Sequence, residues 1–142
     1  MYPTKILLID DEEAFLGAIT RRLEKRGFKT RTARSGQEGI GVLHDDPDID
    51  VVILDVKMPG MDGIQTLKEM KRQFPLLEVI MLTAHGTMET AIEGMKLGAL
   101  DYLMKPCEMP DLMKKVELAK QNRDERQKKI LEATCKELGI ER

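Results

Sequence analysis

Apolar residues in this chain form short runs that alternate with amphipathic segments. The runs at 6–9, 51–54 and 79–82 are continuously apolar, which is typical of strands whose two faces are both covered. In the segments between them, apolar positions recur every three or four residues, as on a helix with one buried face. This alternation predicts βα units in series, and therefore an α/β fold with a parallel, doubly wound sheet.

The polarity of the expected strands also indicates their order in the sheet. The strands are residues 5–9, 28–33, 51–54, 78–82 and 100–104. The second contains Lys29 and Arg31, and the fifth contains Asp101 and Tyr102, so both suit the edges of the sheet. The flavodoxin-like order 2-1-3-4-5 places these two strands outermost.

Five helices are expected to connect and follow these strands. The first, from about residue 12 to 27, has an apolar face made of Phe15, Leu16, Ile19 and Leu23. Ser35 and Glu38 have the spacing of a capping box at the start of the second helix. The third ends before Pro75, the fourth covers about 87–97, and Pro110 falls in the first turn of the fifth.

Residues suited to phosphoryl chemistry follow four of the five expected strands. Asp10 and Asp11 follow the first strand, and Asp55 follows the third. Thr83 follows the fourth, and Lys105 follows the fifth. Because the carboxyl ends of parallel strands share one edge of the sheet, where ligands bind in open α/β folds, we expect these side chains to converge there.

The residues of the expected cluster suit metal binding and phosphoryl transfer. Unpaired carboxylates about 4 Å apart repel by roughly 1 to 4 kcal/mol, and a divalent cation removes that penalty. Hard oxygen ligands with room for water suit Mg²⁺, and one carboxylate can attack phosphorus to form an aspartyl phosphate. Lys105 can supply a further positive charge and Thr83 a hydroxyl donor, which is what phosphoryl transfer requires.

Each of these residues also has an ordinary structural interpretation. Asp10 and Asp11 precede a helix and can act as an N-cap pair. Asp55 can be a turn former, Thr83 can cap the following helix, and Lys105 can be a solvated lysine before a proline. Complementary chemistry at four strand ends favours a site over four unrelated coincidences.

Size and composition narrow the possible functions. A chain of 142 residues is most simply one domain with a surplus at one end. The net charge of −2 argues against direct nucleic-acid binding through bulk electrostatics, and no apolar stretch is long enough to span a membrane. Cys107 and Cys135 fit neither a disulfide framework nor a metal-ligand spacing, and the first residues resemble no signal peptide. We therefore expect a cytoplasmic protein with reduced thiols.

Several segments together resemble the receiver domain (CheY-like) of two-component response regulators. They are residues 6–12, 54–63, 81–86 and 98–106. The resemblance covers about Lys5 to Lys120, in the family's order and spacing, and the stretch 83–106 looks most like receivers attached to ATPase-type activators of transcription.

The resemblance implies a role for each residue of the cluster. Asp55 would accept a phosphoryl group from a phosphohistidine on a sensor histidine kinase. Asp10 and Asp11 would hold Mg²⁺ together with Asp55 and the backbone carbonyl of Lys57. Lys105 would contact the phosphoryl group, and its bond to Pro106 would be cis.

The resemblance also implies a conformational switch. Thr83 would move toward the phosphoryl group and Tyr102 would turn inward, altering the face made of the fourth helix, fifth strand and fifth helix. That face would signal to an output domain or partner protein, and relatives often form homodimers through it. Lys57 and His85 occupy positions that tune the lifetime of the phosphoryl group, and a cation at Lys57 predicts slow hydrolysis.

Residues 1–120 are expected to form the receiver, and residues 121–142 a charged helical extension or linker. Its apolar positions continue a stripe from the last helix and are Ile130, Leu131, Ala133, Leu138 and Ile140. Arg123 and Arg126 break this stripe. A solvated linker to an absent output domain and a helix that packs on a partner or a second copy both remain open. Nothing in the chain resembles a helix-turn-helix, a Walker loop or a catalytic output domain.

Three classes of function are possible for such an acidic cluster. The leading hypothesis is a signalling phosphoacceptor domain and not an enzyme, with self-phosphorylation and its hydrolysis as the only chemistry. A haloacid-dehalogenase-like phosphatase is disfavoured, because its two acids are spaced Asp-x-Asp after the first strand and a cap covers its substrate. A phosphate-independent scaffold is disfavoured because the acidic set is intact.

Overall fold

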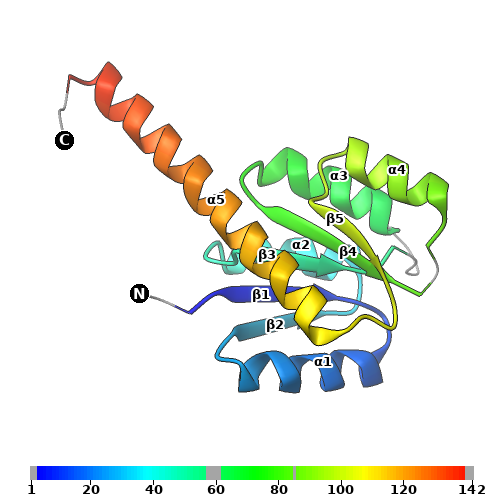
Figure 1. Cartoon of the computed structure of the whole chain (residues 1–142). Helices are drawn as coiled ribbons and strands as arrows, with labels where there is room; N and C mark the ends of the chain where they lie inside the picture. Colours follow the sequence, from blue (N-terminus) through cyan, green and yellow to red (C-terminus); the bar gives the residue numbers. More distant parts are fainter. Residues whose placement is uncertain (1–2, 57–61, 85, 140–142) are drawn as a thin grey trace.

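The computed structural model describes residues 3–56, 62–84 and 86–139, and its centre is one parallel sheet (Figure 1). Its strands are β1 (Lys5–Ile9), β2 (Lys29–Ala33), β3 (Val51–Leu54), β4 (Glu78–Thr83) and β5 (Asp101–Met104). They lie in the order β2-β1-β3-β4-β5 and every neighbouring pair is parallel. The flavodoxin-like order predicted from strand polarity is confirmed.

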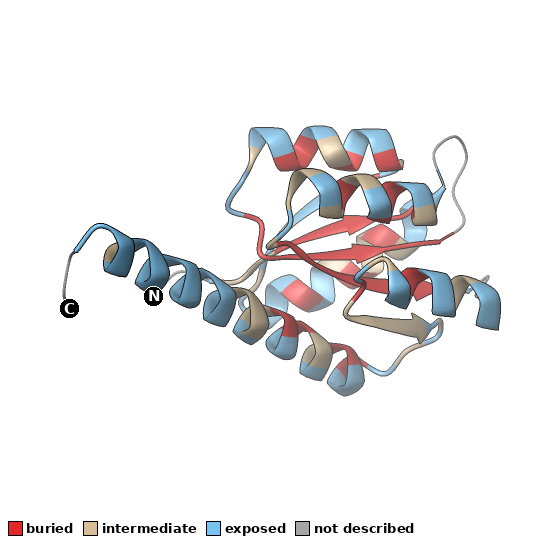
Figure 2. Cartoon of the chain, turned by 90° about the horizontal axis from the view of Figure 1, so that it is seen from above, coloured by how far each residue is buried: buried red, intermediate tan, exposed pale blue. Residues whose placement is uncertain are grey.

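Five helices cover both faces of the sheet (Figure 2). They are α1 (Glu13–Lys25), α2 (Gly36–Asp45), α3 (Gly63–Gln73), α4 (Met88–Lys96) and α5 (Met109–Glu137). One apolar layer joins the sheet to α1 and α5, and the other joins it to α2 and α3. None of the helices in the described part of the chain is long and apolar enough to cross a membrane.

The continuous apolar runs lie in the interior strands because both of their faces are buried. In β1, Ile6 and Leu8 face the α1–α5 layer, whereas Leu7 and Ile9 face the α2–α3 layer. These four side chains are at most 1% exposed, and full burial of each is worth about 1.5–3 kcal/mol. The sheet therefore provides a rigid frame, and the residues that follow its strands have fixed positions.

The helix starts agree with the predicted signals in all but one detail. Pro110 lies in the first turn of α5, as predicted. Ser35 caps α2 by accepting a hydrogen bond from the Glu38 amide at 3.1 Å. The Glu38 carboxylate, however, accepts from the amide of Arg34 at 3.0 Å and not from that of Ser35. The reciprocal half of the predicted capping box is thus displaced by one residue.

Helix α5 runs from the sheet's carboxyl edge past its opposite edge and then projects beyond the body of the molecule (Figure 1). Near that opposite edge its cations bind two buried acids at the starts of β3 and β4. Arg123 and Lys120 bond Asp50 at 3.2 and 3.0 Å, and Arg126 bonds Glu78 at 2.5 Å. The arginines that interrupt the apolar stripe therefore anchor the helix. A domain boundary at residue 120 stays a prediction.

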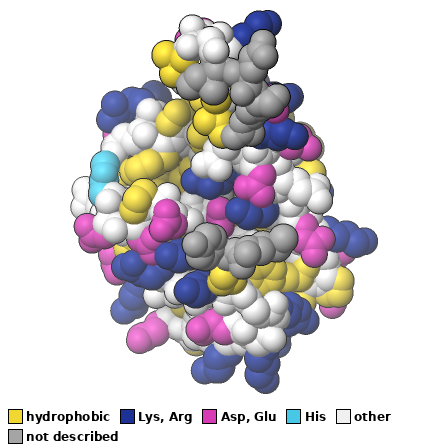
Figure 3. Space-filling view, turned by 90° about the vertical axis from the view of Figure 1, so that its left-hand side faces the viewer, with side chains coloured by type: hydrophobic (Ala, Val, Ile, Leu, Met, Phe, Trp, Pro, Cys, Tyr) yellow, Lys and Arg dark blue, Asp and Glu magenta, His cyan; other side chains and the backbone are white. Residues whose placement is uncertain are grey.

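Charges of both signs are interspersed on the face at the amino-terminal edge of the sheet (Figure 3). The acids and bases of the α5 anchors belong to this edge, so part of this mixture consists of paired charges. Neither sign dominates the face, in agreement with the small net charge of the chain.

Candidate functional site

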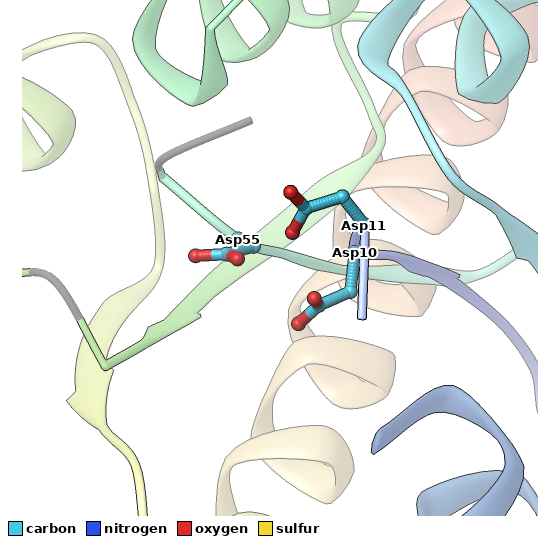
Figure 4. Close-up of side chains that lie close together, drawn as sticks. All are labelled: Asp10, Asp11 and Asp55. Atoms are coloured by element: carbon cyan, nitrogen blue, oxygen red, sulfur yellow. The ribbon is translucent and has the colours of Figure 1, made fainter. Parts of the chain in front are cut away.

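Three carboxylates meet at the carboxyl edge of the sheet (Figure 4). Asp10 follows β1 and Asp55 follows β3, and their amides extend the strand ladder through bonds to Ala33 and Ile9 at 3.1 and 2.9 Å. One oxygen from each of Asp10, Asp11 and Asp55 lies within 4.8 Å of the others. The convergence predicted from the strand ends is therefore present in the fold.

Burial raises the free-energy cost of ionising the carboxylates of this cluster. Asp10 and Asp55 are only 2% and 3% exposed, whereas Asp11 is half-buried. Burial raises the pKa of Asp10, and the neighbouring charge of Asp55 adds to that shift, although bonds from Lys105 and the Glu12 amide oppose it. The site therefore disfavours the ionised form of Asp10, and a further positive charge nearby would stabilise that form. Oxygen donors of this kind are the ligands that Mg²⁺ prefers.

Lys105 reaches the cluster from the end of β5. Its Nζ donates to an Asp10 oxygen at 2.5 Å and lies 3.5 Å from Glu12. Its side chain is 10% exposed, so it is not the solvated lysine of the ordinary interpretation. Its amide donates to the carbonyl of Thr83 at 2.9 Å, which holds the two strand ends together. The Lys105–Pro106 peptide bond is cis, as the resemblance implied.

The capping interpretations do not describe these strand ends. The N-cap residue of α1 is Glu12, and Asp10 instead accepts from the Glu12 amide at 2.9 Å. The N-cap of α4 is Thr87, whose side chain accepts from the amide of Thr90. Thr83 lies four residues earlier, fully buried at the end of β4. The acids and the threonine are thus positioned by the sheet and not by the helix starts.

Gly63 brings the start of α3 against the backbone that follows β3. A Cβ at this position would overlap the carbonyl oxygen of Asp55 and the Cα of Val56. The Gly63 amide donates to the carbonyl of Val56 at 2.7 Å. The missing side chain therefore lets a helix lie directly against Asp55. Gly63 lies in one of the segments that resemble a receiver, but its contact with the backbone of Asp55 and Val56 could not be predicted from the sequence.

Tyr102 contacts α4 through its hydroxyl. It lies in β5 opposite Met81, and its oxygen is 2.9 Å from Oγ1 of Thr90. A Cβ on Gly86 would overlap this hydroxyl, so the loop before α4 has space for the ring only because residue 86 is glycine. The side chain predicted to switch is therefore connected to the first turn of the fourth helix.

Comparison with known proteins decides the family. Over residues 6–117 the sequence matches the response regulator receiver domain. The chain belongs to this family. It is 38% identical over 108 residues to the regulatory protein AtoC of Escherichia coli K12, covering 76% of this chain and 23% of AtoC. It is also 38% identical over 114 residues to the transcriptional regulatory protein ZraR of the same strain, covering 80% and 26%.

Solved receivers share the fold. The crystal structure of a response regulator receiver domain protein from Clostridium thermocellum superposes with a TM-score of 0.80 at 41% identity, covering 90% of this chain and 98% of that one. In a CheX–CheY–BeF₃–Mg²⁺ complex from Borrelia burgdorferi, the matched chain has a TM-score of 0.76 at 29% identity, with coverages of 81% and 87%. The predicted CheY-like receiver, similar to those of transcriptional regulators, is confirmed. The match spans about a quarter of the length of AtoC or ZraR.

Two predicted positions of the receiver lie outside the described residues. These are Lys57, whose carbonyl was expected to bind the metal, and His85. Their roles stay predictions. One further contact of the receiver was not predicted from the sequence: Lys105 Nζ lies 3.8 Å from the ring centroid of Phe15. Phe15 was expected only as part of the apolar face of the first helix, and no short-range pattern indicates its distant partner.

Proposed function

We propose that Asp55 accepts a phosphoryl group from a phosphohistidine on a sensor histidine kinase, in a reaction that requires Mg²⁺. A carboxylate oxygen of Asp55 forms the bond to phosphorus as the bond from phosphorus to the histidine nitrogen breaks. One observation carries this proposal. Asp55 lies in one cluster with Asp10 and Asp11, and the ammonium of Lys105 contacts that cluster through Asp10.

The surrounding residues have distinct parts in this proposal. Asp10, Asp11 and Asp55 supply oxygens that fit Mg²⁺, joined by the backbone carbonyl of Lys57. The bound cation would offset the negative charge of the carboxylates and the phosphoryl oxygens. Lys105 leaves Asp10 to contact a phosphoryl oxygen, and its compact charge suits that role. The proposed chemistry is limited to transfer of this group to Asp55 and its later hydrolysis, as in a signalling domain that has no separate substrate.

The Thr83 hydroxyl donates to another phosphoryl oxygen, and its movement changes the space available to Tyr102. The change spreads to the face made of α4, β5 and α5, because Tyr102 joins β5 to α4. Several large apolar side chains are exposed on these elements, including Met88, Ile92, Met95, Met104 and Leu118. Such exposure supports contact of this face with an output domain, a downstream protein or a second copy of the chain.

The length of the relatives supports an output beyond the receiver. AtoC and ZraR are about four times as long as the segment that matches this chain, and ZraR is named a transcriptional regulatory protein. The receiver would then act on transcription through a further domain, without touching nucleic acid itself. A cytoplasmic location is part of this proposal. Lys57 and His85 are proposed to set how long the phosphoryl group persists.

Mass spectrometry of the intact chain tests the acceptor. With acetyl phosphate and Mg²⁺, the protein should gain one phosphoryl mass, stable in acid and labile in base. Asp55→Asn should abolish the gain, whereas Asp45→Asn, which alters an exposed acid at the end of α2, should preserve it. Chelation of Mg²⁺ should stop the reaction. A gain that persists in Asp55→Asn, or no gain in the unaltered chain, would contradict the proposal.

A further inference from the structure

The ammonium of Lys105 lies against an aromatic ring. Phe15 is the third residue of α1 and is half-buried, and its ring centroid is 3.8 Å from Lys105 Nζ. Both residues line a hollow between α1 and the start of α5 that has a volume of about 390 Å³. A cation within about 6 Å of a ring centroid is attracted by the negative face of the ring. The contact therefore has a favourable electrostatic geometry.

Water has little access to the Lys105 side chain itself. The Lys105 side chain is 10% exposed, and Asp10 and Glu12 are its carboxylate neighbours at 2.5 and 3.5 Å. Poor access to solvent strengthens the attraction between a cation and a ring. The ammonium is thus held by acidic oxygens and by the face of Phe15.

The two kinds of partner differ in their effect on phosphoryl transfer. A carboxylate neutralises the ammonium and competes with the phosphoryl oxygens for it. An aromatic ring restricts the position of the ammonium without carrying a formal charge. A lysine side chain has several rotatable bonds and loses entropy when it is ordered, so a partner that orders it beforehand favours the reaction.

We propose that Phe15 is a positioning residue for Lys105, and this inference rests on the function proposed above. The ring keeps the ammonium beside the carboxylate cluster while Lys105 exchanges Asp10 for a phosphoryl oxygen. Phe15 itself touches no reacting atom in this proposal. It acts through Lys105 alone.

Phosphorylation rates of matched variants test this role. Phe15→Leu removes the ring and should slow phosphorylation by acetyl phosphate about 3- to 10-fold, the range expected for a partly desolvated cation–ring contact. Phe15→Tyr retains a ring face and should stay within about twofold of the unaltered chain. Ile19→Val, a core change on the same helix, should leave the rate unchanged.

A double-mutant cycle separates positioning from general packing. If Phe15 acts through Lys105, Phe15→Leu should slow a Lys105→Ala variant no further, because the interaction is already absent. A slowing of equal size in both backgrounds, or an unchanged rate in Phe15→Leu, overturns the proposal. Loss of rate in Ile19→Val to the same extent overturns it too, since the effect would then reflect packing.

Proton NMR gives a readout that does not depend on phosphorylation. The ε-methylene protons of Lys105 should be shifted upfield by the ring in the unaltered chain and in Phe15→Tyr, but not in Phe15→Leu. An identical shift in Phe15→Leu overturns the contact. If the unaltered chain shows the shift but gains no phosphoryl mass, the proposed function fails and the positioning role fails with it. If it gains the mass at a rate that Phe15→Leu shares, only the positioning role is wrong.

Discussion

At the scale of single residues, Asp10 shows the cost of assembling the site. Its pKa is raised because burial outweighs the bonds from Lys105 and the Glu12 amide. A raised pKa means that the folded chain binds a proton more tightly than the unfolded chain. The contribution of Asp10 to stability therefore falls as the pH rises from about 4 through the raised pKa. Ionisation of this buried carboxylate therefore lowers the stability of the metal-free fold.

Replacing this carboxylate should stabilise the metal-free protein. We expect Asp10→Asn to raise the free energy of unfolding by about 1 kcal/mol at pH 7, because it removes a buried charge and its repulsion by Asp55. The difference from the unaltered chain should shrink as the pH is lowered toward 4. Thermal unfolding in the presence of a chelator measures this difference in the free energy of unfolding. Saturating Mg²⁺ should make the difference smaller, because it stabilises only the unaltered chain. A difference that grows toward low pH would contradict this account.

Gly63 is important because it has no side chain. Gly63→Ala places a Cβ against the backbone of Asp55 and Val56, and should destabilise the fold by about 1–3 kcal/mol. Gly41→Ala is the matched control, since a Cβ there has no neighbour within 4 Å and Gly41 lies inside α2. This control should stabilise by about 0.5–1 kcal/mol. Urea unfolding compares the two, and equal effects would show that the contact at Gly63 is unimportant.

At the scale of helices and strands, the bond between Thr90 and Tyr102 links β5 to α4. The Thr90 hydroxyl also takes part in the capping box with Thr87. A movement of Tyr102 therefore removes a partner from the first turn of α4. This arrangement gives the helix a direct response to the position of one ring.

Removing the hydroxyl should release the ring. We expect Thr90→Val to change the near-ultraviolet circular dichroism of Tyr102 and to cost about 1 kcal/mol of stability, the usual value of a lost cap. The chain has two tyrosines and no tryptophan. In a Tyr2→Phe background, Tyr102 is therefore the one tyrosine that contributes to the near-ultraviolet signal. Thr87→Ala, which weakens the cap but leaves Thr90 in place, should preserve the Tyr102 signal. A changed signal in that control would assign the effect to the cap alone.

Sequence patterns predicted elements well because the relevant forces are local. Apolar runs and polar edge strands determined the order of the sheet, and strand ends indicated Asp10, Asp55 and Lys105 as neighbours. The contacts of Arg123 with Asp50, 73 residues away, and of Lys105 with Phe15 were not predictable in this way. Such pairs depend on how helices lie on the sheet, which periodicity does not specify.

At the scale of the whole molecule, α5 is fixed to the body near the far edge of the sheet. Asp50 and Glu78 are 6% and 2% exposed, and their shortest ion pairs are those with α5, because the other cation near Glu78, Lys71, lies 4.0 Å away. Breaking such a pair from one side is costly, because the remaining charge stays buried. The anchors therefore determine how the projecting part of the helix is oriented.

Loss of the anchors should loosen the helix locally. We expect Arg123→Ala with Arg126→Ala to increase amide hydrogen exchange at least about tenfold across residues 127–137, because loss of two ion pairs exceeds 1.4 kcal/mol. Exchange in β1 and β3 should change much less. Lys128→Ala with Lys129→Ala, at exposed positions of the same helix, is the control and should have little effect. Equal exchange in both variants would mean that the anchors do not hold the helix.

These anchors also place a pivot at the middle of α5. Lys120, Arg123 and Arg126 are centred on residue 123 of a helix that runs from Met109 to Glu137. At 1.5 Å per residue, about 21 Å of helix lies on each side of Arg123. A tilt that moves the first turn by about 1 Å would therefore move the far end by about 1 Å in the opposite direction. A partner bound near Glu137 would sense such a tilt reversed in direction and at its full size.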